Sequence, residues 1–175
     1  MAIGGATNSL LVITGSMGAG KTSVLAEASD ILALRHISHA AIDLDALGLA
    51  YVPAAGDSAM YSNLRSVCEN YAALGVRRFL LARAVEDRAQ LEICRDAVSA
   101  TDMIVCRLVA TIETMQQRIQ VRETGMLQCE FATRITKVND ILERVQLEDF
   151  IVTNENRPLT DVALEVLVKA GWVSN

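Results

Sequence analysis

The sequence predicts an α/β fold in which a parallel β-sheet is covered by helices on both faces. Two observations lead to this prediction. Short apolar runs alternate with longer segments whose apolar residues recur every three or four positions, and the alternation continues along the whole chain. The 175 residues, of which 51% are hydrophobic, also supply enough apolar side chains for the core of one domain spanning residues 1–175.

Five short apolar runs are expected to form the strands, because parallel strands that are covered on both faces are apolar throughout. The run Leu10-Leu11-Val12-Ile13 is typical. The strands are expected at about residues 9–14, 38–43, 77–83, 102–109 and 149–153.

Six segments with a period of about 3.6 residues are expected to form the helices. The first of them places Val24, Ala28 and Leu32 on one side. Glycines follow three of the later segments, where a left-handed residue commonly ends a helix. The helices are expected at about residues 20–34, 58–74, 86–99, 112–124, 130–147 and 159–170, with a loop over 51–57.

The turn after the first strand carries a phosphate-binding motif. Residues 15–22 fit the pattern G-x-x-x-x-G-K-[ST]. Glycines let backbone N–H groups converge on phosphate oxygens, and the following helix adds the positive end of its dipole. Lys21 is expected to reach the β- and γ-phosphates, and Thr22 to ligate Mg²⁺. The residues predicted to bind a nucleoside triphosphate here are Gly15, Ser16, Met17, Gly18, Ala19, Gly20, Lys21, Thr22 and Ser23.

Two carboxylates end the second predicted strand, in the sequence Ile42-Asp43-Leu44-Asp45. Ligands of open α/β sheets lie beyond the carboxyl ends of the strands, so both acids are expected to face the phosphate loop. One carboxylate can hold Mg²⁺ while the other accepts the proton of an attacking hydroxyl group. We assign Asp43 to the metal, and either Asp43 or Asp45 to the hydroxyl group. The alternative is a helix cap and an ordinary turn residue.

At these motifs the chain resembles the small P-loop kinases of the shikimate kinase, gluconate kinase, adenylyl-sulfate kinase and chloramphenicol phosphotransferase type. The resemblance implies a P-loop NTPase fold, which is a three-layer α/β/α sandwich with five parallel strands in the order 2-3-1-4-5. It also implies a lid helix with the pattern Arg-x-x-x-Arg after the fourth strand, which Arg118 and Arg122 match. Asn154 lies in the stretch that corresponds to the adenine-binding loop of these kinases.

The activity implied by the resemblance is transfer of the γ-phosphate of ATP, with Mg²⁺, to a hydroxyl group of a small molecule. Lys21 and Arg118 would then neutralise the transferring group, and a guanidinium could also stack on adenine. Two solvated arginines on an exposed helix are the alternative for Arg118 and Arg122.

The acceptor molecule is not predicted, because the chain has no acceptor-binding motif of these kinases. In place of a Gly-Gly-Gly stretch after the third strand, it has Leu81-Ala82-Arg83-Ala84-Val85-Glu86-Asp87-Arg88. Candidates for holding an anionic acceptor are Arg83, Arg88, Arg65 and Asn63, with solvated surface charge as the alternative. Residues 56–82 are also similar to a group of small ATP-binding proteins from actinobacteria, a similarity that indicates no substrate.

Three other functions fit parts of the pattern. A GTP-dependent switch could use Asp45-Ala46-Leu47-Gly48 as a D-x-x-G motif, but the Asn-Lys-x-Asp sequence that recognises guanine is absent. A regulatory module could bind ATP without any small-molecule acceptor. A nucleoside monophosphate kinase could use Arg65, Arg83 and Arg88 for the phosphate of its second nucleotide.

The composition favours a cytoplasmic protein that binds neither nucleic acid nor membranes. The net charge is −5 and aromatic residues make up only 4% of the chain, so a basic, ring-rich nucleic-acid surface is not expected. No apolar run is long enough to span a bilayer. The spacing of Cys68, Cys94, Cys106 and Cys129 matches no zinc or redox motif and suggests buried thiols in a reducing compartment. The oligomeric state is not predicted.

Overall fold

The computed structural model describes residues 7–50, 54–122, 125 and 128–174. Its central sheet has five parallel strands in the order β2-β3-β1-β4-β5, which confirms the predicted sheet and strand order. The strands are β1 (Asn8–Thr14), β2 (Ala40–Asp43), β3 (Arg78–Ala82), β4 (Ala100–Val109) and β5 (Phe150–Thr153).

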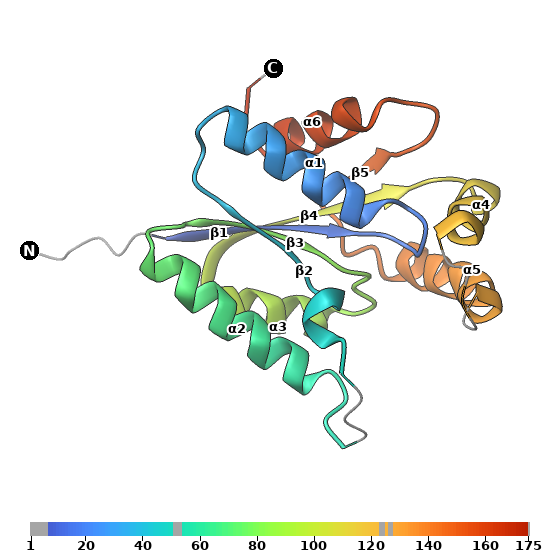
Figure 1. Ribbon diagram of the computed structural model, residues 1–175, viewed down its shortest axis with the longest axis horizontal. Helices are drawn as coiled ribbons and strands as arrows, with labels where there is room; N and C mark the ends of the chain where they lie inside the picture. Colours follow the sequence, from blue (N-terminus) through green and yellow to red (C-terminus); the bar gives the residue numbers. More distant parts are fainter. Residues whose placement is uncertain (1–6, 51–53, 123–124, 126–127, 175) are drawn as a thin grey trace, which may run out of the picture.

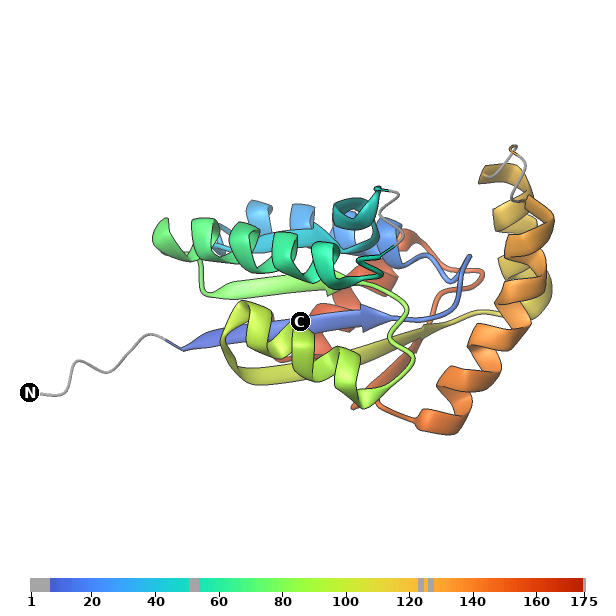
Figure 2. The same ribbon diagram turned by 90° about the horizontal axis from the view of Figure 1, so that it is seen from below.

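Helices cover both faces of the sheet (Figure 1). One face carries α1 (Lys21–Leu34) and α6 (Leu159–Lys169), and the other carries α2 (Ser58–Ala73) and α3 (Arg88–Val98). The remaining two, α4 (Ile112–Arg122) and α5 (Gln128–Val145), stand as a pair beyond the carboxyl ends of the strands (Figure 2). A 3₁₀ turn, η1 (Asp45–Gly48), follows β2. The carboxyl edge of the sheet therefore lies between η1 on one side and the α4–α5 pair on the other.

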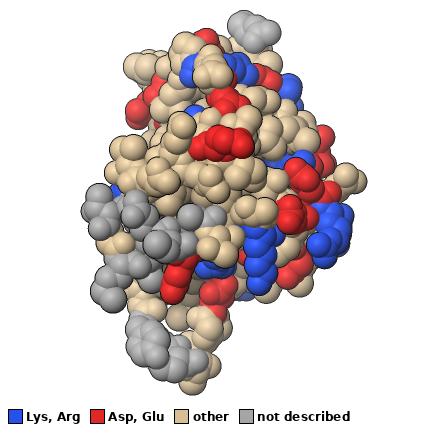
Figure 3. Space-filling model, turned by 90° about the vertical axis from the view of Figure 1, so that its right-hand side faces the viewer, with Lys and Arg blue, Asp and Glu red and all other residues tan. Residues whose placement is uncertain are grey.

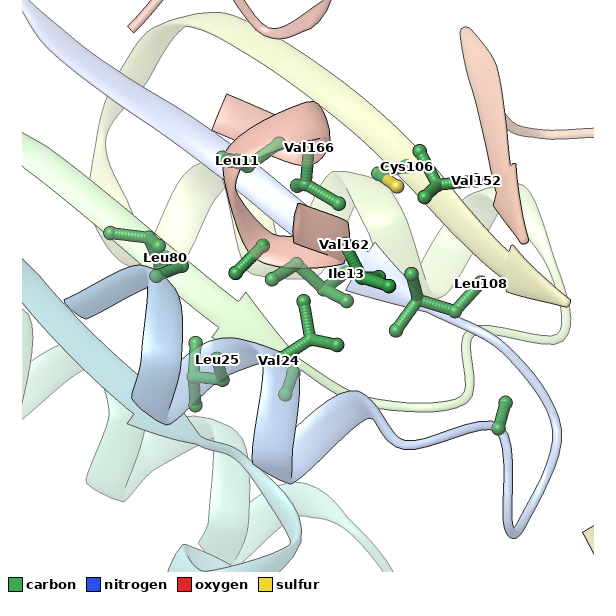
Figure 4. Close-up of a cluster of buried hydrophobic side chains, with 14 of the residues drawn as sticks. Leu11, Ile13, Val24, Leu25, Leu80, Cys106, Leu108, Val152, Val162 and Val166 are labelled. Atoms are coloured by element: carbon green, nitrogen blue, oxygen red, sulfur yellow. The ribbon is translucent and has the colours of Figure 1, made fainter. Parts of the chain in front are cut away.

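The core consists of two apolar layers, one on each face of the sheet. Figure 4 shows the layer beneath α1 and α6, where Ile13 of β1 packs among Val24 of α1 and Val162 of α6. All three side chains are fully buried, and each such side chain contributes about 2 kcal/mol relative to leaving it in water. This packing fixes the end of β1 and the start of α1, and the phosphate-binding motif joins these two elements.

Several element boundaries differ from the predicted ones for local reasons. β2 begins at Ala40 instead of residue 38, and His39 just before it bonds through its ring to the Ile37 carbonyl and the Ser29 hydroxyl. β4 begins two residues early, at Ala100, because Ser99 takes a left-handed conformation that ends α3. α5 also begins two residues earlier than predicted. Residues 51–53 of the predicted loop and residues 123–124 of the predicted fourth helix lie outside the described residues.

The cysteines of the described part are buried thiols, as the sequence predicts. Cys68, Cys94 and Cys106 are all free and buried, and burial raises the pKa of the Cys106 thiol to about 12. The side chain of Cys129 lies outside the described part. Among the helices described, none combines the length and apolar character needed to cross a membrane.

Candidate nucleotide and acceptor site

The phosphate-binding motif forms a tight loop between β1 and α1. Gly18 and Gly20 adopt φ values of +78° and +95°, which side chains with a Cβ rarely accept. There is also no room for a methyl group, since a Cβ on Gly18 would collide with the backbone of Met115 in α4. A Cβ on Gly15 would lie 2.6 Å from the carbonyl oxygen of Leu108. The glycines of the motif are therefore required by the packing around the loop as well as by its backbone conformation.

Hydrogen bonds to three other segments brace this loop. Ser16 Oγ donates a hydrogen bond to the Ile135 carbonyl in α5 at 2.9 Å. Asn154, which follows β5, donates from Nδ2 to the Ala19 carbonyl at 2.8 Å. Arg118 of α4 donates to the Gly18 carbonyl at 3.2 Å and to the Asn154 carbonyl at 2.9 Å. The braces use only carbonyls and one side chain of the loop and so occupy none of its N–H groups, although within the loop the Ala19 N–H donates to the Ser16 carbonyl at 3.2 Å.

Lys21 is the first residue of α1, and its ammonium lies against the loop. Its Nζ donates to the Ser16 carbonyl at 3.1 Å. The pKa of Lys21 is lowered to about 8, chiefly by burial, with Asp45 and Asp43 acting to raise it and Arg122 acting to lower it. An ammonium group shielded from water and short of partners binds a polyphosphate more strongly than a solvated one would, since it has less hydration to lose.

The two acids predicted to face the loop do so, but in different settings. Thr22 Oγ1 donates to Asp43 Oδ2 at 2.7 Å, and the Asp45 backbone N–H donates to Asp43 Oδ1 at 3.2 Å. Both carboxylate oxygens of Asp43 are thus engaged. The Asp45 side chain is 67% exposed and pairs with Arg83 at 3.5 Å. The hydroxyl and carboxylate oxygens of Thr22 and Asp43 suit Mg²⁺, which commonly takes one carboxylate and completes its shell with phosphates and water.

Two adjoining hollows of about 270 and 250 Å³ lie against the loop. Arg118, Gly20 and Ser23 line both of them, Arg122 lines the first, and Asn154 the second. The four-residue spacing thus brings Arg118 and Arg122 to one hollow, as predicted from the helical period.

On the other side of the acids lies a separate cavity of about 260 Å³, between η1, the start of α2 and the end of β3. Asp45, Asp57, Asn63, Arg83 and Arg134 supply its polar lining. The guanidinium of Arg83 donates to Asp57 Oδ2 at 2.5 Å and lies 5.6 Å from the ring centre of Tyr61.

Two arginines that the sequence offered as acceptor ligands are not part of this cavity. Arg65 and Arg88 have exposed side chains, and neither lines the cavity beside Asp45. They come from the same crossover segments as Asn63 and Arg83, so chain position alone did not distinguish the two pairs. The structure therefore brings together only part of the predicted acceptor set.

One carboxylate that the sequence did not point to joins α4 to the loop after β5. Glu155 accepts hydrogen bonds from the Thr111 backbone N–H at 3.3 Å, from the Thr111 hydroxyl at 2.7 Å and from the Thr114 hydroxyl. These bonds lower the pKa of Glu155. The carboxylate thereby caps the first turn of α4, where the helix dipole favours negative charge. Thr111 marks a helix start in the sequence, but nothing there points to a partner 44 residues away.

Arg134 and Arg157 were missed as well. Arg134 reaches the cavity beside Asp45 from α5, and Arg157 lines the hollow that Asn154 also lines while it pairs with Glu165 at 2.6 Å. Figure 3 shows the face at which the strands end, where basic and acidic side chains are interspersed. On the visible part of this face, no single sign of charge dominates.

No protein-family model and no curated protein matches the chain. Solved structures do match. Shikimate kinase from Acinetobacter baumannii in complex with shikimate has a TM-score of 0.61 at 16% identity, with 97% of each chain covered. The APS kinase CysC of Mycobacterium tuberculosis in complex with AMPPNP and APS has a TM-score of 0.64 at 19% identity, with 94% of this chain and 98% of that chain covered.

A gluconokinase from Sinorhizobium meliloti matches with a TM-score of 0.60 at 16% identity, over 95% of this chain and 93% of that chain. The chain thus has a P-loop NTPase fold, similar to the structures of small P-loop kinases over nearly its whole length. The resemblance predicted from the motifs is confirmed at the level of the fold.

Proposed function

We propose that residues 1–175 act as one cytoplasmic domain that transfers the γ-phosphoryl group of ATP, with Mg²⁺, to a hydroxyl group of a small molecule. The observation that supports this most directly is the position of Asp45. Its carboxylate faces the phosphate loop closely enough to raise the pKa of Lys21, and it also lines the separate cavity of about 260 Å³. A site that only binds ATP has no need of the second cavity.

The nucleotide is held mainly by main chain and arginine in this proposal. The N–H groups of residues 16–22 receive the phosphate oxygens, and Lys21 and Arg118 neutralise the charge on the transferring γ-phosphoryl group. Arg122 and Asn154 line the hollows beside the loop that would take the rest of the nucleotide. Thr22 and Asp43 would hold Mg²⁺, which supplies charge neutralisation at the β- and γ-phosphates when bound.

The different settings of the two acids assign them different tasks. Asp43 has both oxygens engaged by Thr22 and the backbone, whereas Asp45 is exposed to the cavity. We therefore assign the acceptor to Asp45. The acceptor oxygen forms the new bond to the γ-phosphorus while its proton passes to Asp45, and the bond from the γ-phosphorus to the bridging oxygen breaks with its electron pair leaving on ADP.

A nucleoside monophosphate kinase has less support from this geometry. Of the three arginines that the sequence offered for a second phosphate, Arg65 and Arg88 lie away from the cavity, and Arg83 is already engaged by two carboxylates. A regulatory ATP-binding module remains as the alternative outcome of the test.

The test is ADP release by the full chain with Mg²⁺ and ATP over a library of alcohols, sugars, cyclitols and nucleosides. We expect at least one class of hydroxyl compound to stimulate turnover. With that compound, Asp45→Asn should lower kcat by about 10² to 10⁴-fold, the range for loss of a general base, with MgATP affinity nearly unchanged. Asp96→Asn, which alters an exposed acid of α3, is the control. Tight ATP binding with no stimulation by any compound would instead support the regulatory module.

A further inference from the structure

The charged side chains that line the acceptor cavity differ in how far they are exposed to a ligand. The charged residues of its described lining are Asp45, Asp57, Arg83 and Arg134. Arg83 is the most enclosed of the first three, with 13% of its side chain exposed, against 67% for Asp45 and 59% for Asp57. The deeper wall of the cavity therefore presents the edges of two carboxylates with a guanidinium held between them.

Arg83 already has two anionic partners. Its Nη2 lies 2.5 Å from Asp57 Oδ2 and its Nη1 lies 3.5 Å from Asp45 Oδ1. The three groups together carry a formal charge of −1. A carboxylate or phosphate on an acceptor would have to displace one of these partners and would then lie beside the displaced acid, a like-charge contact that is unfavourable. Arg134, the other cation of the described lining, belongs to α5 and makes no ion pair with this cluster in the described part of the chain.

The two carboxylates each keep one oxygen for a ligand. Asp45 Oδ2 and Asp57 Oδ1 accept no hydrogen bond from the described part of the chain, whereas Asp45 Oδ1 and Asp57 Oδ2 face Arg83. Asp45 is the group assigned to the reacting hydroxyl. Asp57 lies on the other side of the Arg83 guanidinium from Asp45. A ligand whose hydroxyl group contacts Asp45 would therefore present a different group to the free oxygen of Asp57.

We propose that the acceptor is a hydroxyl compound with a protonated amine, whose hydroxyl group meets Asp45 and whose ammonium group meets Asp57. This inference rests on the proposed kinase function and deepens it. Asp57 supplies a charge-assisted hydrogen bond to the ammonium group, and Arg83 holds the two acids apart at the separation that the ligand must match. The amino alcohol, aminocyclitol and amino sugar classes meet this requirement, whereas sugar acids and sugar phosphates do not.

The experiment measures kcat/KM for acceptors grouped in matched series with the full chain and MgATP. In the open-chain series, the members are 1-amino-1-deoxyglucitol, glucitol and gluconate, and the cyclitol, sugar and nucleoside series likewise pair an amine with a neutral and an anionic member. We expect the amine to exceed the anion by at least about tenfold, the factor for one charge-assisted hydrogen bond. Preference for an anionic member, or equal use of the amine and neutral members, would overturn the inference.

Asp57→Asn distinguishes a direct role of Asp57 from an effect on folding. Asp57 precedes α2 without a side-chain cap hydrogen bond, so the substitution leaves the start of α2 intact while it removes the charge and weakens the ion pair with Arg83. We expect KM for the amine to rise about tenfold with kcat retained. Use of the matched anion should improve, because Arg83 gains a free donor. Asp30→Asn, in an exposed acid of α1, is the control.

An unchanged ratio of amine to anion in Asp57→Asn would overturn the role of Asp57. If no member of any series stimulates turnover while MgATP still binds, then the kinase function itself fails. A kinase that prefers anionic acceptors would overturn only the inference about the amine. The experiment therefore distinguishes failure of that inference from failure of the proposed kinase function.

Discussion

The nucleotide half and the acceptor half of the site are built from different parts of the chain. The phosphate loop is a main-chain structure, in which glycines have no room for a methyl group and Ser16, Arg118 and Asn154 make the bracing contacts. The acceptor cavity depends instead on charged side chains in connecting segments, such as Asp57 before α2 and Arg83 after β3.

The difference has consequences for how each half can change. A ligand site made of main chain is tied to the fold, because altering it moves β1, α1 and the helices that pack on the loop. A site whose acids are exposed side chains, as Asp45 and Asp57 are, can be altered one residue at a time at small cost to stability. Acceptor specificity is therefore the easier property to change, which agrees with a P-loop fold shared at 16% to 19% identity with kinases for shikimate and APS.

The largest effect is expected from Lys21→Met, which removes the one charged side chain built into the loop. We expect kcat/KM for ATP to fall about 10³-fold, because a charge poised at the γ-phosphate is lost. The free energy of unfolding of the nucleotide-free protein should instead rise by about 1 to 3 kcal/mol, since a pKa lowered to about 8 shows that burial opposes the ammonium.

Steady-state ADP release and thermal unfolding measure the two effects of Lys21→Met. Lys137→Met, in an exposed lysine of α5, serves as the control and should change neither quantity appreciably. A variant that lost both activity and stability would contradict the idea that burial of the Lys21 ammonium destabilises the empty protein while it strengthens phosphate binding.

A smaller effect is expected from Gly18→Ala, compared with Gly75→Ala as its matched control. Both glycines have positive φ values, +78° and +89°, but a Cβ on Gly75 has nothing within 4 Å whereas one on Gly18 meets the Met115 backbone. We expect denaturant unfolding to give a cost of about 1 kcal/mol for Gly75→Ala and about 3 kcal/mol for Gly18→Ala. Equal costs would mean that the loop has more room than its packing indicates.

The same contrast explains which features the sequence could predict. The motif at residues 15–22 predicts the main-chain conformation of the phosphate loop directly, because glycines and a lysine at this spacing are specific to such loops. The apolar runs similarly predicted all five strands and, through the family resemblance, their order. Asp43 and Asp45 were predictable because the carboxyl end of a strand is a fixed place in an open sheet.

The acceptor half was not predictable in the same way. Arg65 and Arg83 are both arginines of the crossover region, and only packing places Arg83 between two carboxylates and leaves Arg65 in solvent. Glu155 reaches the start of α4 from the loop after β5, and Arg134 reaches the cavity from α5. Such contacts between distant segments depend on tertiary geometry, which no local pattern of residue types encodes.

The smallest of the three effects is a pH dependence that belongs to the nucleotide half. With burial lowering the pKa of Lys21 to about 8 in the empty protein, the ammonium is lost as pH rises through 8, while bound phosphates would restore the proton. We expect MgATP affinity to fall about tenfold between pH 7 and pH 9, with proton uptake visible by calorimetry in buffers of different ionisation enthalpy.

The stability of the empty protein should change in the opposite sense. The unfolded chain keeps the Lys21 proton up to its ordinary pKa of 10.5, so between about pH 8 and 10.5 the unfolded state binds more protons and the free energy of unfolding rises with pH. Lys21→Met should remove this contribution, and Asp57→Asn, in the acceptor half, should leave it in place. If MgATP affinity does not change from pH 7 to 9, then the Lys21 ammonium is exposed to water. That result would contradict the contrast between a buried nucleotide half and an exposed acceptor half.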